Sequence, residues 1–264
     1  MRRVKRRIWS GMVLEQEIYT CAEGVPAKLA RPRLRFKDEE QRRAHREAQG
    51  LREFIRSVNA TFSCGGGLYS TLTFDDAHEV HTFEEAKRIR AAYVRRLQRR
   101  HPDAVVFAVL GRGENTSRIH MHMLTLNVPE EDIIALWRQG AVKRVEPMRE
   151  RNILRGGVAV GRDYSGLAAY LWRHWTPEQG GHHVFKTRNA KKCEREDAAE
   201  CRTSYSETKP PKVPRAPEGY EWVLCDYMGT SYGFQWFKWV MTPIKKKGKP
   251  GRPVKVKSDE NGNT

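Results

Sequence analysis

The stretch RIHMHML, residues 118–124, places two histidines one residue apart in an otherwise apolar run. On a β-strand, residues i and i+2 face the same side, so His120 and His122 point together, with β-carbons about 7 Å apart. Two imidazoles in this arrangement can converge on one metal ion at about 2.1 Å each. Ile119 and Met121 face the other way, into the core. The alternative interpretation is a pair of half-exposed histidines on a sheet face.

A second stretch, DYSGLAAYLWRHW, predicts a helix over 163–175 with Tyr170 in its middle. Arg173 and His174 follow at i+3 and i+4 and share the face of Tyr170, whereas Tyr164 lies on another face. A tyrosine hydroxyl has an ordinary pKa of about 10 and is a poor nucleophile unaided. A divalent cation on a phosphate, with a cationic side chain nearby, supplies the missing electrophilic help. The two stretches together indicate cleavage of a DNA phosphodiester by Tyr170; the alternative is a tyrosine of an amphipathic core.

The composition favours an anionic partner. The 264 residues carry a formal net charge of +17, and nucleic acid is the usual partner of so basic a chain, with a membrane surface as the rival. No apolar run approaches the about 18 residues of a membrane-spanning helix, and Glu15 and Glu17 interrupt the N-terminal apolar stretch, so we expect no export signal. The cysteines number 5, an odd count without a C-x-x-C pair, and favour reduced thiols in a cytoplasm.

The elements that must position these residues alternate between helices and strands. Apolar residues at helical spacing predict the helices, and Thr82 with Glu85 has the spacing of a capping box; alternating or continuous apolar runs predict the strands. In chain order we expect a helix at 38–58, a strand at 68–74, a helix at 82–100, strands at 105–110 and 119–128, a short helix at 130–138, a weak strand at 156–161 and a helix at 163–175. This order predicts an α+β fold, with helices flanking a central, mainly antiparallel sheet.

Charge and aromatic content change along the chain and suggest a division into segments. Residues 1–37 are basic and poorly periodic, with a short strand near Ile18 as the only sign of order. We expect the following segments: a basic N-terminal extension (1–37), a nuclease core (38–190), a charged, proline-containing linker (191–217), a small aromatic β segment (218–242) and a basic disordered tail (243–264).

Taken in order, several stretches resemble the His-hydrophobe-His (HUH) endonucleases that initiate rolling-circle replication in bacteriophages and plasmids. NATFSCGGGLYSTLTF (59–74) is similar to the first motif of that family, RIHMHML to its metal motif and DYSGLAAYLWRHW to its tyrosine motif. HHVFKTRNAKK resembles a Ser-Arg-Asn stretch that often follows, and EGYEWVLCDY (218–227) a frequent C-terminal segment. The resemblance spans roughly residues 40–240.

The resemblance implies a ferredoxin- or RRM-like sheet core and a set of roles for individual residues. His120 and His122 would hold Mg²⁺ or Mn²⁺, with Glu114 as the third ligand. Tyr170 would attack the scissile phosphate and become a 5′-phosphotyrosine, leaving a free 3′-OH. Arg173 stands where the family usually has a lysine; it keeps the charge but does not donate a proton in the same way.

The resemblance also implies partners. We expect a replication initiator that acts on single-stranded DNA at an origin in the cytoplasm of a bacterial host cell, with a host helicase or polymerase as a candidate partner and no membrane. The alternatives are a single-tyrosine transposase of the same superfamily and a non-catalytic basic DNA- or RNA-binding protein. The residues expected to contact DNA phosphates, each of which can equally be a solvated surface charge, are Arg88, Arg95, Arg96, Arg99, Arg118, Lys186 and Arg188.

Overall fold

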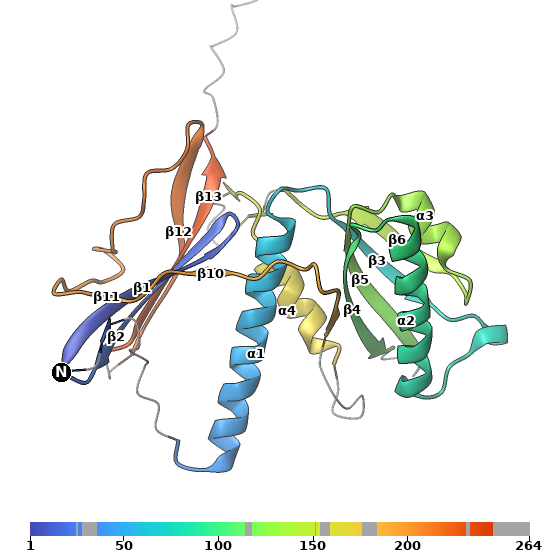
Figure 1. Ribbon diagram of the computed structural model, residues 1–264, viewed down its shortest axis with the longest axis horizontal. Helices are drawn as coiled ribbons and strands as arrows, with labels where there is room; N and C mark the ends of the chain where they lie inside the picture. The colour runs from blue at the N-terminus through green and yellow to red at the C-terminus, as the bar shows by residue number, and fades with distance from the viewer. Residues whose placement is uncertain are drawn as a thin grey trace, which may run out of the picture.

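The chain folds around two sheets with helices between and beside them. The computed structural model describes residues 1–24, 26–27, 36–113, 118–150, 152–153, 159–175, 184–230 and 233–244. Within these residues there are four α-helices and two large antiparallel sheets, which confirms the expected α+β class (Figure 1). In the described part of the chain, no helix combines the length and the apolar character needed to cross a membrane.

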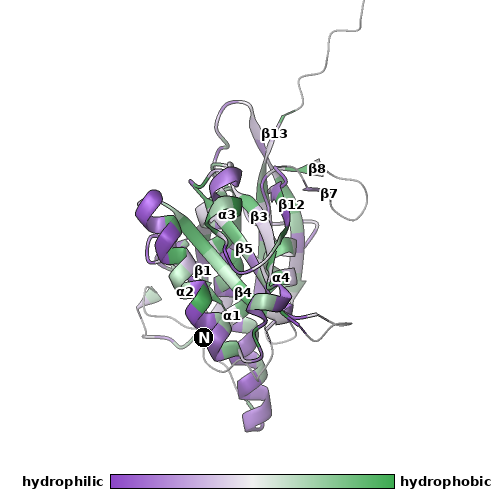
Figure 2. Ribbon diagram, turned by 90° about the vertical axis from the view of Figure 1, so that its right-hand side faces the viewer, coloured by the Kyte–Doolittle hydropathy of each residue, from purple (hydrophilic) through white to green (hydrophobic). Residues whose placement is uncertain are grey.

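Two long helices begin at side-chain caps: Thr82, as its spacing from Glu85 predicted, and Asp38. In α1 (Glu39–Phe62) the Asp38 side chain, and in α2 (Phe83–Arg100) the Thr82 side chain, accepts the backbone N–H of the third helical residue. The first half of α1 is polar and projects from the body of the molecule (Figures 1 and 2). Its second half is buried and extends four residues beyond the expected end at Val58, because Phe62 packs in the core below the sheet.

We call the sheet formed by the middle of the chain the central sheet. Its strand order is β6-β3-β5-β4-β9, and every neighbouring pair is antiparallel. The expected strands at 68–74, 105–110 and 119–128 form its middle. The bounds are β3 (Leu68–Thr73), β4 (Val105–Arg112), β5 (Ile119–Leu126), β6 (Val142–Pro147) and β9 (Phe185–Lys186). A separate two-stranded sheet pairs β7 (Asn152–Ile153) with β8 (Ala159–Val160).

The central sheet is covered on both faces. Helices α2 and α3 (Glu130–Leu136) pack on one face, against side chains that include Met121 and Met123. Helices α1 and α4 (Ser165–Arg173) pack on the other, against side chains that include Val109 and Leu124. Burial on both faces explains why β4 is a nearly continuous apolar run, which Figure 2 shows in green. Since Leu124 shares a strand face with His120 and His122, both histidines face α1 and α4.

The two ends of the chain form a second sheet, which we call the terminal sheet. An N-terminal hairpin pairs with a C-terminal hairpin through β2 and β13, and the strand order is β10-β1-β2-β13-β12, with β11 also paired to β1. Helices α1 and α4 lie between this sheet and the central sheet (Figure 1). The bounds are β1 (Arg2–Ser10), β2 (Val13–Cys21), β10 (Glu194–Arg195), β11 (Ala199–Glu200), β12 (Tyr220–Gly229) and β13 (Gln235–Pro243).

Residues 1–21 form two strands, β1 and β2, and not the one short strand near Ile18 that we expected. The charged residues that break the apolar pattern are paired across the sheet and with α1. Arg56 of α1 donates to both carboxylate oxygens of Glu15 at 2.8 Å and is 3.2 Å from Glu17, and all three side chains are at least seven-eighths buried. Buried charges that are paired and hydrogen-bonded tolerate such positions, so polarity alone did not indicate disorder here.

Candidate metal centre

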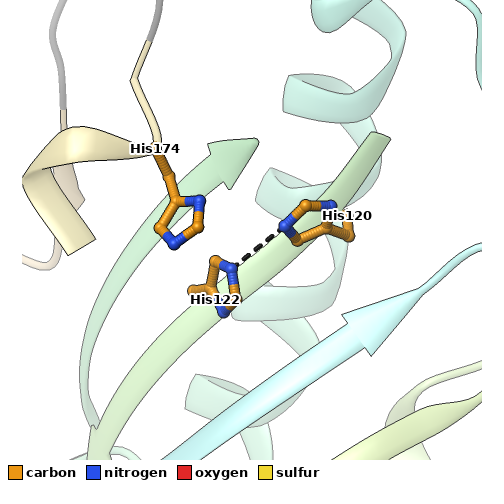
Figure 3. Close-up of side chains that lie close together, drawn as sticks. All are labelled: His120, His122 and His174. Carbon is orange, nitrogen blue, oxygen red and sulfur yellow. Dashed lines mark hydrogen bonds between the residues drawn. The ribbon is translucent and has the colours of Figure 1, made fainter. Parts of the chain in front are cut away.

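Two of the expected metal ligands lie side by side on β5. The Nε2 atoms of His120 and His122 are 3.0 Å apart (Figure 3). His122 is paired across the sheet with Thr71 of β3 and Val109 of β4, which fixes the direction of its side chain. It is 5% exposed, whereas His120 is half-buried. The expected convergence of the two imidazoles on one side of the strand is confirmed.

A third imidazole completes the cluster, and it comes from the end of α4. His174 is the C-cap of α4, and its ring centroid lies 4.3 Å from that of His122 and 5.8 Å from that of His120. Figure 3 shows the three rings directed toward one another. One nitrogen of each ring lies within 4.8 Å of the corresponding nitrogens of the other two. Three such nitrogens can hold a metal ion.

His174 was not among the expected ligands, although its position in the sequence carried a signal. It follows Tyr170 at i+4 and therefore shares its helix face, but which sheet residues that face would meet is decided by the packing of α4. The expected third ligand, Glu114, lies outside the described residues. Among the described residues, the cluster that can hold an ion consists of histidines alone.

The close approach of β4 and α4 at this point depends on a glycine. Gly111 is paired with His120, and a β-carbon at this position would lie 3.2 Å from His120 Nε2 and 3.3 Å from both Cβ and Nδ1 of His174. Few real β-carbons are found so close to another heavy atom. Because only glycine lacks this atom, Gly111 makes room for the two imidazoles to face each other.

Burial keeps the histidines of β5 neutral. Burial, with the adjacent His174 and His120 rings, lowers the pKa of His122 to about 3. Burial also lowers the pKa of His120. Neutral imidazole is the form that binds a metal ion. The donor set therefore fits a divalent cation in composition, and the two histidines of β5 fit it in protonation.

The other ring nitrogen of His122 is oriented by hydroxyl groups of β3. The Tyr69 hydroxyl lies 2.8 Å from His122 Nδ1, and the Thr71 hydroxyl lies 3.2 Å from the same atom. The Tyr69 and His122 rings are nearly parallel, with centroids 5.9 Å apart. Hydrogen bonds to the nitrogen that does not bind metal fix the ring orientation of a ligand histidine. Here those bonds are to hydroxyls rather than to a carboxylate.

Tyr170 borders the cluster. Its ring centroid lies 4.6 Å from that of His174 and 5.8 Å from that of His122, and the residue is 39% exposed. Burial, together with the hydroxyl of Tyr170, raises the pKa of Tyr69. Tyr164, by contrast, is 3% exposed and packs edge-on against Phe62. The helix thus presents one tyrosine to the histidines and buries the other in the core.

Arg173 is not part of the cluster. It is exposed, and within the described residues no hydrogen bond or ion pair joins it to the histidines or to Tyr170. The last turn of α4 thus contributes the imidazole of His174 to the cluster, and the catalytic role expected for Arg173 stays a prediction.

The start of α4 is held from both sides. Asn59 of α1 accepts the backbone N–H of Tyr164 at 2.7 Å and donates to the Ser165 hydroxyl at 3.2 Å. Lys238 of β13 donates to Asp163 at 2.6 Å and to Ser165 at 2.9 Å. Burial acts to raise the pKa of Asp163, but the charge of Lys238 and its hydrogen bond lower it. The terminal sheet and α1 therefore determine where Tyr170 and His174 lie.

The candidate DNA-contacting residues are distributed over different surfaces. Arg88, Arg95, Arg96 and Arg99 belong to α2, which covers the sheet face opposite the histidines. Arg96 is engaged by the carbonyl of Leu136 and by Gln139, and Arg118 pairs with Asp76 and Glu79.

The two remaining candidates lie at or just beyond the edge strand β9. Lys186 is paired with Phe107 and lies 3.4 Å from the Ser57 hydroxyl of α1, on the same sheet face as the histidines. Arg188 follows in the chain and is exposed. Lys186 is thus the candidate cation that β9 places on the sheet face of His120 and His122.

No protein-family model, no curated protein and no solved structure matches this chain. The cluster of His120, His122 and His174 is consistent with a metal site of the HUH kind. Its function is inferred below from its geometry.

Proposed function

We propose that this protein nicks and rejoins single-stranded DNA through a covalent bond to Tyr170, and that it does so to initiate rolling-circle replication. The observation that carries the proposal is the contact of the Tyr170 ring with His122 and His174. A nucleophile and a set of metal ligands that share one partly open site are what phosphodiester cleavage by tyrosine requires.

In the proposed step, the hydroxyl oxygen of Tyr170 attacks phosphorus and the P–O3′ bond breaks. The phenol proton leaves to solvent, and the departing 3′ oxygen takes up a proton. The products are a 5′-phosphotyrosine and a free 3′-OH. One phosphodiester replaces another, so neither ATP nor a redox partner is required, and attack by a 3′-OH on the phosphotyrosine rejoins the strand.

His120, His122 and His174 would hold a divalent cation. A bound cation supplies electrophilic stabilisation of the charge that develops on the phosphate oxygens. Both Mg²⁺ and Mn²⁺ favour oxygen ligands, but Mn²⁺ is a first-row transition metal and binds imidazole nitrogen more readily than Mg²⁺ does. Of the two ions that the resemblance implies, we therefore propose Mn²⁺. Tyr69 and Thr71 keep His122 oriented, and Gly111 leaves room for His174.

The test is covalent trapping. The full chain is incubated with a pool of single-stranded oligonucleotides and Mn²⁺, and adducts are separated on a denaturing gel. We expect an adduct whose mass maps to the peptide of Tyr170 and which is lost with Tyr170→Phe and with EDTA. Tyr164→Phe is the matched control, since it removes a buried hydroxyl from the residue that precedes the same helix, and it should retain the adduct. Binding without an adduct would overturn the proposal in favour of a non-catalytic DNA-binding protein.

A further inference from the structure

The face of the terminal sheet that is turned away from α1 carries a pocket. We call this face of the sheet the outer face. Along β2 its residues alternate with Glu15 and Glu17, whose side chains point to the other face and pair with Arg56 of α1. The pocket has a volume of about 550 Å³, within the range of sites that take small ligands (about 300–1,000 Å³). It is lined by Arg3, Thr20, Ser204, Tyr205, Tyr227, Gly229, Thr230, Gly233 and Gln235.

The polar groups of this outer pocket are prepared for an anionic, hydrogen-bonding ligand. Arg3 donates to the Gln235 side-chain oxygen at 2.7 Å, and Ser204 lies 3.5 Å from the same guanidinium. The Gln235 side-chain nitrogen donates to the backbone carbonyl of Tyr205 at 2.6 Å. Among the described lining residues there is no carboxylate. Arg3 is therefore oriented by neutral groups and keeps its positive charge available.

Two aromatic rings complete the lining. Tyr227 packs on Phe237 beneath it, with ring centroids 4.8 Å apart, and is half-buried, as is Tyr205. A tyrosine that is braced by a second ring loses little conformational freedom when it stacks on a flat ligand. Aromatic side chains in a basic groove are the usual platform for unpaired bases.

The two faces of this sheet differ in charge: the outer face carries cations, whereas on the inner face Arg6 and Arg56 neutralise the carboxylates of β2. Arg3, Lys5 and Arg7 alternate along β1 on the outer face, whereas the carboxylates of β2 point to the inner face. Arg7 lies 3.6 Å from Glu196, but neither Arg3 nor Lys5 has a carboxylate partner within the described residues. A row of cations next to the pocket is suited to the phosphates of a strand whose base enters it.

We propose that the outer pocket binds an unpaired nucleotide of single-stranded DNA, with the base against Tyr205 and Tyr227 and the phosphate beside Arg3. The inference deepens the proposed function, on which it rests, because it assigns the terminal sheet to capture of the strand outside the cleavage site. The terminal sheet and the central sheet lie on opposite sides of the layer formed by α1 and α4 (Figure 1). The outer pocket belongs to the terminal sheet and the histidines of β5 to the central sheet, so the two sites would contact different parts of one strand.

The test measures binding without cleavage. Fluorescence anisotropy with a labelled pool of single-stranded oligonucleotides is recorded in EDTA, with Tyr170→Phe as the parent. We expect Tyr227→Leu and Arg3→Ala each to raise Kd about tenfold. Tyr227→Phe should bind like the parent, which separates loss of the ring from misfolding. Arg46→Ala, which removes an equal charge from the exposed N-terminal half of α1, should raise Kd less than about twofold.

A second measurement locates the strand directly. Oligonucleotides that contain 5-iodo-2′-deoxyuridine are photo-crosslinked, and we expect the crosslinked peptides to contain Tyr205 or Tyr227. The inference is overturned if Tyr227→Leu and Arg3→Ala weaken binding no more than Arg46→Ala does, or if the crosslinks are confined to other elements. Covalent trapping by Tyr170 is measured separately, so either proposal can fail while the other stands.

Discussion

Tyr170 and His174 lie one helical turn apart at the end of α4, and their rings meet edge to face with centroids 4.6 Å apart. The candidate nucleophile and a candidate metal ligand therefore belong to one rigid element. Helix geometry sets the spacing between them, while β5 supplies the other two ligands. Any shift of α4 along the sheet would move both groups together relative to His120 and His122.

The contribution of His174 can be tested by its removal. Loss of a group that only orients a metal ligand weakens metal binding about 10–100-fold. We expect His174→Ala to weaken Mn²⁺ binding by more than this, because a ligand itself is lost. Isothermal titration calorimetry measures the effect. His78→Ala is the control, since His78 is an exposed histidine paired with Asp75. Equal affinity in the two variants would show that the site has no third imidazole.

The hydroxyl of Tyr69 should tune the same site without binding the ion. Tyr69→Phe removes the group that lies 2.8 Å from His122 Nδ1. We expect Mn²⁺ affinity to fall about tenfold. Tyr93→Phe, on the opposite face of the sheet, removes a hydroxyl that donates to the Ile133 carbonyl at 2.7 Å. It should lower the free energy of unfolding by about 1 kcal/mol and leave metal affinity unchanged; the reverse pattern would contradict the assignment.

Gly111 should be sensitive to a single added methyl group. Gly111→Ala places a β-carbon 3.2 Å from His120 Nε2 and 3.3 Å from His174 Cβ, and relieving these contacts requires the two histidines to shift by a few tenths of an ångström. We expect a loss of about 1–3 kcal/mol in the free energy of unfolding and weaker Mn²⁺ binding. Gly166→Ala is the matched control in α4, where an added β-carbon meets nothing within 4 Å; the helix should be stabilised by up to about 1 kcal/mol. Normal metal binding by Gly111→Ala would disprove the close approach.

The ion pair between Lys238 and Asp163 should stabilise the fold in a pH-dependent way. The two side chains are 13% and 8% exposed, so Lys238→Met leaves a buried carboxylate unpaired and should reduce the free energy of unfolding by about 3–5 kcal/mol at pH 7. Because Lys238 lowers the pKa of Asp163, the stabilisation is present above the ordinary aspartate pKa of about 3.9 and is lost as pH falls through the lower value of the folded state.

Urea unfolding at neutral and at acidic pH checks the sign. The difference in the free energy of unfolding between the parent and Lys238→Met should shrink below about pH 4. There Asp163 becomes protonated in the variant and in the unfolded chains. A difference of the same size at both pH values would show that the loss comes from packing of the lysine chain rather than from its charge. Arg46→Met, at an exposed pair with Glu39, should change stability little at either pH.

Local periodicity was enough to predict much of the site. The i, i+2 spacing of His120 and His122 on a strand fixes a common face, and the i, i+4 spacing of Tyr170 and His174 on a helix does the same. The α+β class, the helix start at Thr82 and the aromatic β segment near the C-terminus follow from equally local patterns. In each of these cases the residues that decide the outcome are neighbours in sequence.

What only the tertiary structure decided concerns residues that are distant in sequence. Packing between elements decides that α4 meets the histidine face of the sheet while α2 covers the other face. It also decides that His174 rather than Arg173 reaches the ligands, and that Gly111 makes room for His174. The terminal sheet joins strands more than 200 residues apart, and its charged strands are stable because Arg56 and Lys238 neutralise carboxylates from other elements. Backbone geometry determines which side chains share a face, but burial and charge pairing over the whole chain determine which faces meet.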